Sequence, residues 1–127
     1  MSQRILVIED QEDNRAILRD LLTSVGYEIL EAVNGEAGVR MAEAHRPDLI
    51  LMDIQLPILD GYEATRRIKG DAALHAIPVI AVTSYASSSD VDKARAAGCD
   101  AFVSKPYSPR QLLAKVREYL SSAAPTR

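Results

Sequence analysis

Five side chains with chemical capacity follow short apolar runs of the sequence, and these are Glu9, Asp10, Asp53, Thr83 and Lys105. Three of them are carboxylates, which would repel one another at one edge of a sheet, so keeping them ionised requires a cation. Oxygen ligands with no Cys or His close by in the sequence select a hard metal ion. Mg²⁺ fits best, because it keeps several waters and binds one or two carboxylates together with phosphate oxygens. The sequence therefore predicts a Mg²⁺ site.

The apolar runs before these side chains are typical of buried strands. The clearest runs are Ile5–Ile8, Leu49–Met52 and Val79–Val82, and weaker ones are Tyr27–Ala32 and Ala101–Val103. Because the runs are apolar on both faces, they indicate strands of a parallel sheet that helices cover on both sides. In such a sheet, functional side chains gather at the carboxyl ends of the strands. The five side chains named above all stand at or just after those ends.

Helix-like segments alternate with the strands. The first expected helix ends near Gly26, and the last starts after Ser108. Between them, helices are expected from Asn34-Gly35 to about His45, from Asp60 to about Gly70 and from about Ser87 to Ala97. Apolar stripes support the first and the last helix, at Leu18, Leu21, Leu22 and Val25 and at Leu112, Leu113, Val116 and Leu120. Ser108 as N-cap, Pro109 and Gln111 form a capping box for the last helix. Only Val91 and Ala94 make a clear apolar pair in the fourth helix, which is therefore expected to be loosely held.

The order of elements predicts an α/β fold. Five βα units in strict alternation indicate a right-handed, doubly wound (βα)5 three-layer sandwich with a five-stranded parallel sheet. The length of 127 residues corresponds to a single domain with one core. We expect one domain over residues 1–127, with its core at about residues 4–120 and a frayed tail at residues 121–127.

Composition and charge exclude several classes of protein. Apolar residues make up 47% and charged residues 26% of the chain, as in globular proteins. No apolar run approaches the ~20 residues that span a bilayer, and the first residues lack the features of a signal peptide. Fifteen basic and eighteen acidic residues give a net charge of −3, with no Lys/Arg stripe for nucleic acid. The chain is therefore expected to bind neither membranes nor nucleic acid directly.

The sulfur and imidazole side chains predict a reduced compartment and no catalytic role for these groups. Cys99 is the only cysteine, so an internal disulfide is impossible and a cytoplasmic location is expected. We expect Cys99 to be a small buried side chain rather than a reactive thiol. His45 and His75 flank no other ligands and are expected at the surface.

Taken in order, these motifs resemble a known family. Glu9-Asp10, Asp53 in "LMDIQLPILDG", Thr83 in "AVTSYA" and Lys105-Pro106 in "AGCDAFVSKP" are similar to the receiver domain of two-component response regulators of the stand-alone type. The resemblance extends from about Arg4 to Leu120, nearly the whole chain. It implies a flavodoxin-like strand order of 2-1-3-4-5.

The resemblance also implies a role for each acidic residue. Asp53 would be the nucleophile that takes a phosphoryl group from a phosphohistidine and forms an acyl phosphate. Asp10, Asp53 and the backbone carbonyl of Gln55 would hold Mg²⁺, and Glu9 would act through a water of the metal. The metal would offset negative charge on the phosphoryl oxygens during transfer.

The remaining positions of the motif would bind the phosphate or respond to it. Lys105 would pair with one phosphoryl oxygen, and a cis Lys-Pro peptide bond would set its angle. Thr83 would donate its hydroxyl to another oxygen, and Phe102 would be the aromatic residue that moves in response. Gln55 and Tyr85 vary within the family, and both are expected to flank the path of attacking water.

Three other functions compete with this interpretation. An aspartate-nucleophile phosphatase of the haloacid dehalogenase type wants a second Asp two residues after the nucleophile, where this chain has Gln55. A degenerate receiver used only for docking is disfavoured because all five functional positions are filled. Flavodoxin-like cofactor binding requires a loop rich in Gly, Ser or Thr after the first strand, but Gln11-Glu12-Asp13 is acidic.

The expected partners are therefore proteins. A histidine kinase, a histidine phosphotransfer protein or both would exchange phosphoryl groups with the chain. A downstream protein target would bind the phosphorylated form if the chain is not simply a relay. On this interpretation the protein is a phosphoacceptor in signalling, and it is not an enzyme that turns over an external substrate.

Overall fold

The computed structural model describes residues 3–56, 58–84 and 87–123. Its strands are β1 (Arg4–Ile8), β2 (Glu28–Ala32), β3 (Leu49–Asp53), β4 (Val79–Thr83) and β5 (Ala101–Ser104). Its helices are α1 (Glu12–Thr23), α2 (Gly35–His45), α3 (Gly61–Lys69), α4 (Ser88–Ala97) and α5 (Pro109–Ala123). The alternation of strands and helices that the sequence predicts is confirmed.

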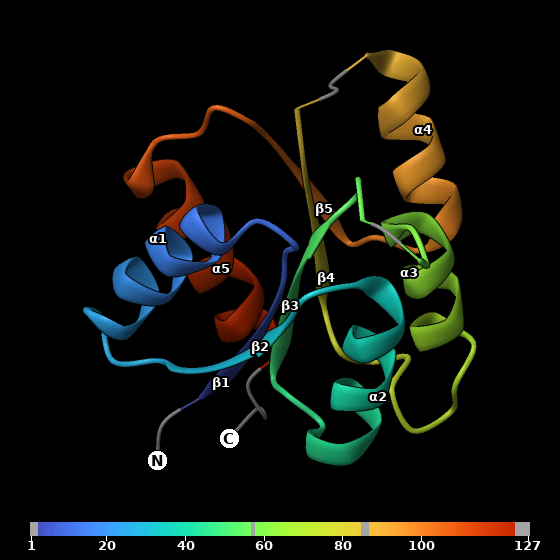
Figure 1. Ribbon diagram of the computed structural model, residues 1–127, viewed down its shortest axis with the longest axis horizontal. Coiled ribbons are helices and arrows are strands. Elements are labelled where there is room, and N and C mark those ends of the chain that lie inside the picture. The colour runs from blue at the N-terminus through green and yellow to red at the C-terminus, as the bar shows by residue number, and fades with distance from the viewer. Residues whose placement is uncertain (1–2, 57, 85–86, 124–127) are drawn as a thin grey trace.

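The strands form one parallel sheet in the order β2-β1-β3-β4-β5, which confirms the expected topology. Figure 1 shows α1 and α5 on one face of the sheet and α2, α3 and α4 on the other. The order reverses at β1, so the carboxyl ends of β1 and β3 flank the point where ligands bind in sheets of this type.

Side chains alternate between the two faces of the sheet with the period of two that strands impose. In β1, Ile5 and Val7 join the buried cluster under α1 and α5, whereas Leu6 and Ile8 join the cluster under α2, α3 and α4. In the predicted apolar stripe of α5, Leu112, Val116 and Leu120 are buried. In contrast, α4 buries only Ala94 and Ala97, and Val91 is half-buried. This sparse packing agrees with the expectation of a loosely held helix.

Capping side chains start the helices where the sequence places them. Asn34 Oδ1 accepts the Ala37 N–H at 2.7 Å, and Asp60 Oδ1 accepts the Glu63 N–H at 2.9 Å. The capping box of α5 is complete: Ser108 Oγ accepts the Gln111 N–H at 3.0 Å, and Gln111 Oε1 accepts the Ser108 N–H at 3.1 Å.

The predicted end of the first helix was wrong. The helix α1 ends at Thr23, and Val25 of its expected stripe is 44% exposed in the turn that follows. Gly26 does mark this turn, since its φ of +98° is a left-handed conformation that favours glycine. The backbone of α5 is helical to Ala123, so the described part of the expected tail belongs to the end of this helix. Residues 124–127 lie outside the described part of the chain.

Among the described residues, no helix has the length and apolar character needed to cross a membrane.

Candidate phosphoacceptor site

Three carboxylates meet where β1 and β3 end. Ligand oxygens of Glu9, Asp10 and Asp53 all lie within 4.8 Å of one another. Glu9 is 2% exposed and Asp53 is 7% exposed, while Asp10 is half-buried. The acidic cluster that the sequence predicts is therefore present, with oxygen as its donor atom throughout.

Lys105 reaches into this cluster from the loop after β5. Its Nζ lies 3.2 Å from Glu9 Oε1 and 3.6 Å from Asp53 Oδ2. The Lys105-Pro106 peptide bond is cis, as the resemblance implied. The Lys105 N–H also donates to the Thr83 carbonyl at 2.7 Å, so the backbones of these two residues are joined directly.

Backbone amides hold two of the carboxylates. The Gln55 N–H donates to Asp53 Oδ1 at 3.0 Å, and the Gln11 N–H donates to Glu9 Oε2 at 3.0 Å. Each bond fixes the rotamer of one carboxylate, and the second oxygen of each carboxylate faces Lys105. Gln55 itself is exposed, at the edge of the site.

Burial raises the pKa of Glu9, and the charge of Asp53 raises it further. The Gln11 N–H and the Lys105 ammonium act in the opposite direction. Burial also raises the pKa of Tyr107, with a smaller contribution from the charge of Glu9. Both groups therefore lie in surroundings that favour their protonated forms.

Gly61 allows α3 to lie against the end of β3. A Cβ atom on Gly61 would stand 2.5 Å from the Asp53 carbonyl oxygen and 2.7 Å from the Ile54 Cα. The Gly61 N–H donates to the Ile54 carbonyl at 3.0 Å, which fixes this approach. Gly61 was not predicted as a site residue, although "LDG" beside the N-cap Asp60 is a signal that could have identified it.

The other predicted positions surround the acidic cluster. Thr83 is buried at the end of β4, opposite Ser104 in the register of the sheet. Phe102 is half-buried and packs against the cluster under α2, α3 and α4. Tyr85 lies outside the described residues. His45 and His75 are exposed, and Cys99 is half-buried, with its Sγ 3.8 Å from Thr65 Oγ1.

The family model of the response regulator receiver domain matches residues 5–117. The chain belongs to the response regulator receivers. Their signalling is based on phosphorylation, and they interact with kinases or phosphotransfer proteins. This membership decides against the phosphatase and the flavodoxin-like alternatives.

Relatives and solved structures agree with the family. The polar-differentiation response regulator DivK of Brucella anthropi is 43% identical over 123 residues, which are 97% of this chain and 100% of that protein. A receiver domain of a histidine kinase from Syntrophus aciditrophicus is 34% identical with a TM-score of 0.92, covering 99% of this chain and 96% of that one.

A second solved receiver domain bears on the metal. It comes from a sensor histidine kinase of Pseudomonas aeruginosa PAO1 and has a magnesium ion coordinated in its active-site cleft. It is 35% identical with a TM-score of 0.89, and the match covers 95% of this chain and 99% of that one. The receiver family generally uses Mg²⁺, and the acidic cluster described above could bind this ion.

Proposed function

We propose that the protein accepts a phosphoryl group on Asp53 and transmits a signal in its phosphorylated form. The phosphoryl group would come from a histidine kinase or a histidine phosphotransfer protein. The observation that carries the proposal is the cluster of three carboxylates with Lys105 3.2 Å and 3.6 Å from two of them. This arrangement joins a buried nucleophile, ligands for a divalent cation and a fixed positive charge at one edge of the sheet.

The donor set suits Mg²⁺, because it is made of oxygen atoms only and its carboxylates crowd one another. Asp10, Asp53 and the backbone carbonyl of Gln55 would be direct ligands, and Glu9 would contact the ion through water. When bound, Mg²⁺ supplies positive charge that offsets the charge on the transferring phosphoryl oxygens.

The transfer is a substitution at phosphorus. A carboxylate oxygen of Asp53 forms the new O–P bond while the P–N bond to the donor imidazole breaks, and the electron pair of that bond returns to the imidazole nitrogen. Lys105 then exchanges part of its contact with Asp53 for one phosphoryl oxygen. The Thr83 hydroxyl donates a hydrogen bond to another phosphoryl oxygen. The chain thus catalyses its own phosphorylation and dephosphorylation, and it is not an enzyme with an external substrate.

The lifetime of the acyl phosphate depends on how water reaches it. Hydrolysis requires a water in line with the bond between the Asp53 oxygen and phosphorus. Gln55 and Tyr85 would flank that line, and a bulky ring there obstructs it. Tyr85→Ala is therefore expected to shorten the lifetime of the phosphoryl group, measured by loss of radiolabel after the donor is removed. An unchanged rate would mean that the ring points elsewhere.

The output would pass through Thr83 and Phe102. Movement of Thr83 toward the phosphoryl group would free space beside β4, and the Phe102 ring could then rotate inward. Two hollows adjoin this ring, a groove of about 70 Å³ toward α4 and one of about 500 Å³ toward α5. A change in the ring would therefore alter the surface formed by α4, β5 and α5, where a target protein could distinguish the two states.

The donor protein would dock around the rim of the site, because Asp53 is too buried for a protein to reach without close contact. A groove of about 540 Å³ lies beside Lys105 and is lined in part by Ile17, Tyr107 and Pro109. Ile17 is 58% exposed on α1, so it offers apolar surface to a partner beside the site. Ile17→Glu should slow transfer from a kinase while leaving labelling by acetyl phosphate unchanged. Equal transfer rates from the kinase would place the docking surface elsewhere.

The direct test is phosphorylation without a partner protein. Purified protein with Mg²⁺ and acetyl phosphate should gain one phosphoryl group, detected by mass spectrometry and lost on treatment with hydroxylamine. Asp53→Asn should abolish labelling, and Asp10→Ala should weaken both labelling and Mg²⁺ binding. Asp60→Asn is the matched control, because Asn also caps a helix and α3 should stay intact. Full labelling of Asp53→Asn would overturn the assignment of the phosphoryl group to Asp53, and a wild type that stays unlabelled would favour a docking module that is not phosphorylated.

A further inference from the structure

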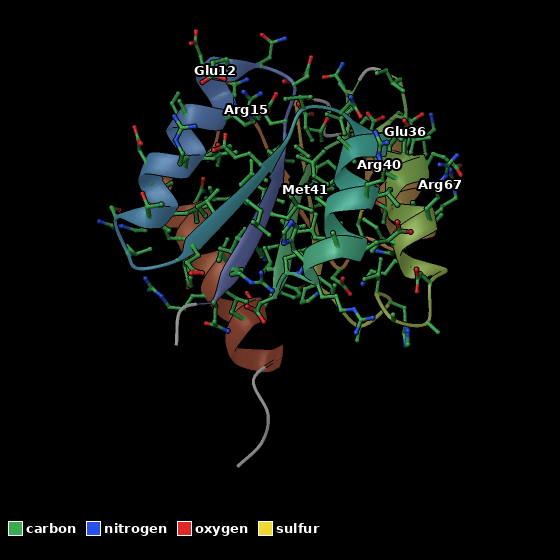
Figure 2. All side chains as sticks on the ribbon, turned by 60° about the horizontal axis from the view of Figure 1, so that its bottom comes forward. Glu12, Arg15, Glu36, Arg40, Met41 and Arg67 are labelled. Carbon is green, nitrogen blue, oxygen red and sulfur yellow. The ribbon has the colours of Figure 1, made fainter. Side chains whose placement is uncertain are left out.

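Arg15 connects α1 to the strand end that carries Glu9 and Asp10. Its Nη1 donates to the backbone carbonyl of Glu9 at 3.0 Å, and its Nε donates to Glu31 Oε1 at 3.1 Å. Nη2 contacts Glu12 Oε1. The side chain is only 12% exposed although it is charged, and Figure 2 shows it at the same end of α1 as Glu12. All three guanidinium nitrogens therefore have acceptors.

These three acceptors fix the direction of the guanidinium. They come from α1, from β2 and from the end of β1, and the guanidinium is a planar group whose donors have set directions. Rotation that kept one hydrogen bond would break at least one of the others. The carbonyl of Glu9 is thereby held in one orientation.

The carbonyl of Glu9 belongs to the peptide plane that leads into Asp10. On the other side of Glu9, its N–H donates to the Ala32 carbonyl of β2 at 3.0 Å. The backbone of Glu9 is thus held on both sides, directly by β2 and through Arg15. We infer that Arg15 is a positioning residue for the Mg²⁺ site, which orients the Glu9–Asp10 peptide so that the Asp10 carboxylate faces Asp53. This inference rests on the proposed function, since it requires Asp10 to be a Mg²⁺ ligand.

Charge and geometry make opposite predictions for Arg15. A positive group near a cation site would by its charge alone weaken cation binding, so its removal would strengthen Mg²⁺ binding. The charge of Arg15 is, however, offset by Glu12 and Glu31. The positioning role therefore predicts that removing Arg15 weakens Mg²⁺ binding.

Arg19 provides a matched control within the same ion-pair cluster. Its Nη1 lies 3.0 Å and 3.1 Å from the two carboxylate oxygens of Glu31. Among the described residues, Glu31 is the hydrogen-bond partner of the Arg19 side chain. Arg19→Met therefore removes a positive charge and a partner of Glu31 but leaves the hydrogen bonds of the Glu9 peptide in place. Arg15→Met also removes a positive charge and a partner of Glu31, and in addition it removes the hydrogen bond to the Glu9 carbonyl.

The experiment measures the Mg²⁺ dissociation constant of the full chain by isothermal titration calorimetry. Arg15→Met should raise it roughly tenfold, as loss of an outer partner of metal ligands does. Arg19→Met should change it by less than about twofold, since the Glu9 peptide keeps its donors. Phosphorylation by acetyl phosphate adds a second readout: Arg15→Met should require more Mg²⁺ for half its maximal rate but reach nearly the wild-type maximum.

Arg15→Lys keeps the experiment decisive if Arg15→Met does not fold. It retains the positive charge but lacks the planar group that reaches three acceptors, so the dissociation constant should still rise by a few-fold. Unchanged or tighter Mg²⁺ binding in Arg15→Met, or in Arg15→Lys if it alone folds, would overturn the inference. Equal weakening by Arg19→Met would overturn it too. If Asp10→Ala binds Mg²⁺ with the affinity of the wild type, the metal assignment of the proposed function would instead be overturned.

Discussion

Replacing Gly61 by alanine is expected to slow phosphorylation of Asp53 and to destabilise the fold. The new Cβ would stand 2.5 Å from the Asp53 carbonyl oxygen and 2.7 Å from the Ile54 Cα, and both are backbone atoms. Ordinary contacts between such atoms are roughly 3.5 Å, so the end of β3 or the start of α3 must move by about 1 Å.

The size of both effects follows from this displacement. Overpacking a well-packed site costs about 1–3 kcal/mol, and the better helix propensity of alanine offsets about 0.5–1 kcal/mol of it. The net cost would be about 0–2.5 kcal/mol, and we expect about 1–2 kcal/mol because both clashing atoms are backbone, which corresponds to a fall in Tm of roughly 4–8 °C for a domain of this size. A misplacement of about 1 Å at the reacting group can lower the rate up to about a hundredfold. We expect the rate constant for acetyl phosphate at saturating Mg²⁺ to fall between about tenfold and a hundredfold.

Gly70, the C-cap of the same helix, offers the matched control. Its φ of −83° suits alanine, and the nearest atom to its new Cβ would be the Arg66 carbonyl oxygen at 3.1 Å. Gly70→Ala should keep the wild-type phosphorylation rate and change the Tm by no more than about 2 °C. The two variants would be compared by differential scanning calorimetry and by initial labelling rates. A wild-type Tm and labelling rate for Gly61→Ala would refute the argument that α3 needs a glycine to approach Asp53.

Three further predictions concern the switch and the buried titratable groups. In NMR spectra, beryllofluoride with Mg²⁺ should shift the backbone amide signals of residues 87–98 and those around Phe102, and Thr83→Ala should lose most of this response. Shifts confined to the metal and phosphate site would contradict the switch and indicate a protein that only relays phosphoryl groups. Burial raises the pKa of Glu9, so its protonated form is favoured in the folded state. Its contribution to stability is fully present below the ordinary pKa of 4.5 and is lost as the pH rises through the raised value. Thermal unfolding in EDTA should therefore show wild type losing Tm relative to Glu9→Gln as the pH rises above 4.5, and parallel curves would contradict this. Burial also raises the pKa of the Cys99 thiol, so Ellman's reagent near pH 8 should label the native chain much more slowly than the chain unfolded in urea, and equal rates would show that the thiol is accessible.

The sequence was sufficient wherever local chemistry or sheet geometry decides the structure. Asp60 and Ser108 cap the helices where they were expected, because a capping bond needs only residues a few positions apart. Glu9, Asp53 and Lys105 meet because parallel strands place their carboxyl ends at one edge, whatever their separation in the chain.

Features that depend on how elements pack could not be predicted in this way. Val25 continues the apolar period of α1, but the chain has already turned toward β2, and a period does not record where a helix ends. The bond from Arg15 to the Glu9 carbonyl requires α1 to lie against β2, where Glu31 anchors the guanidinium. The need for glycine at Gly61 likewise follows from the distance between α3 and β3.

The sparse packing of α4 sets how much free energy is needed to move it. The buried side chains of this helix are two methyl groups, those of Ala94 and Ala97. Each buried methyl group contributes about 0.8 kcal/mol, so exposing both costs about 2 kcal/mol. A hydrogen bond to a charged group contributes roughly 1.5–3 kcal/mol. If Thr83 exchanged its present contact for a bond to a charged phosphoryl oxygen, the free energy involved would be of the same order as that which packs α4, whereas α5, with three large buried side chains, would stay in place.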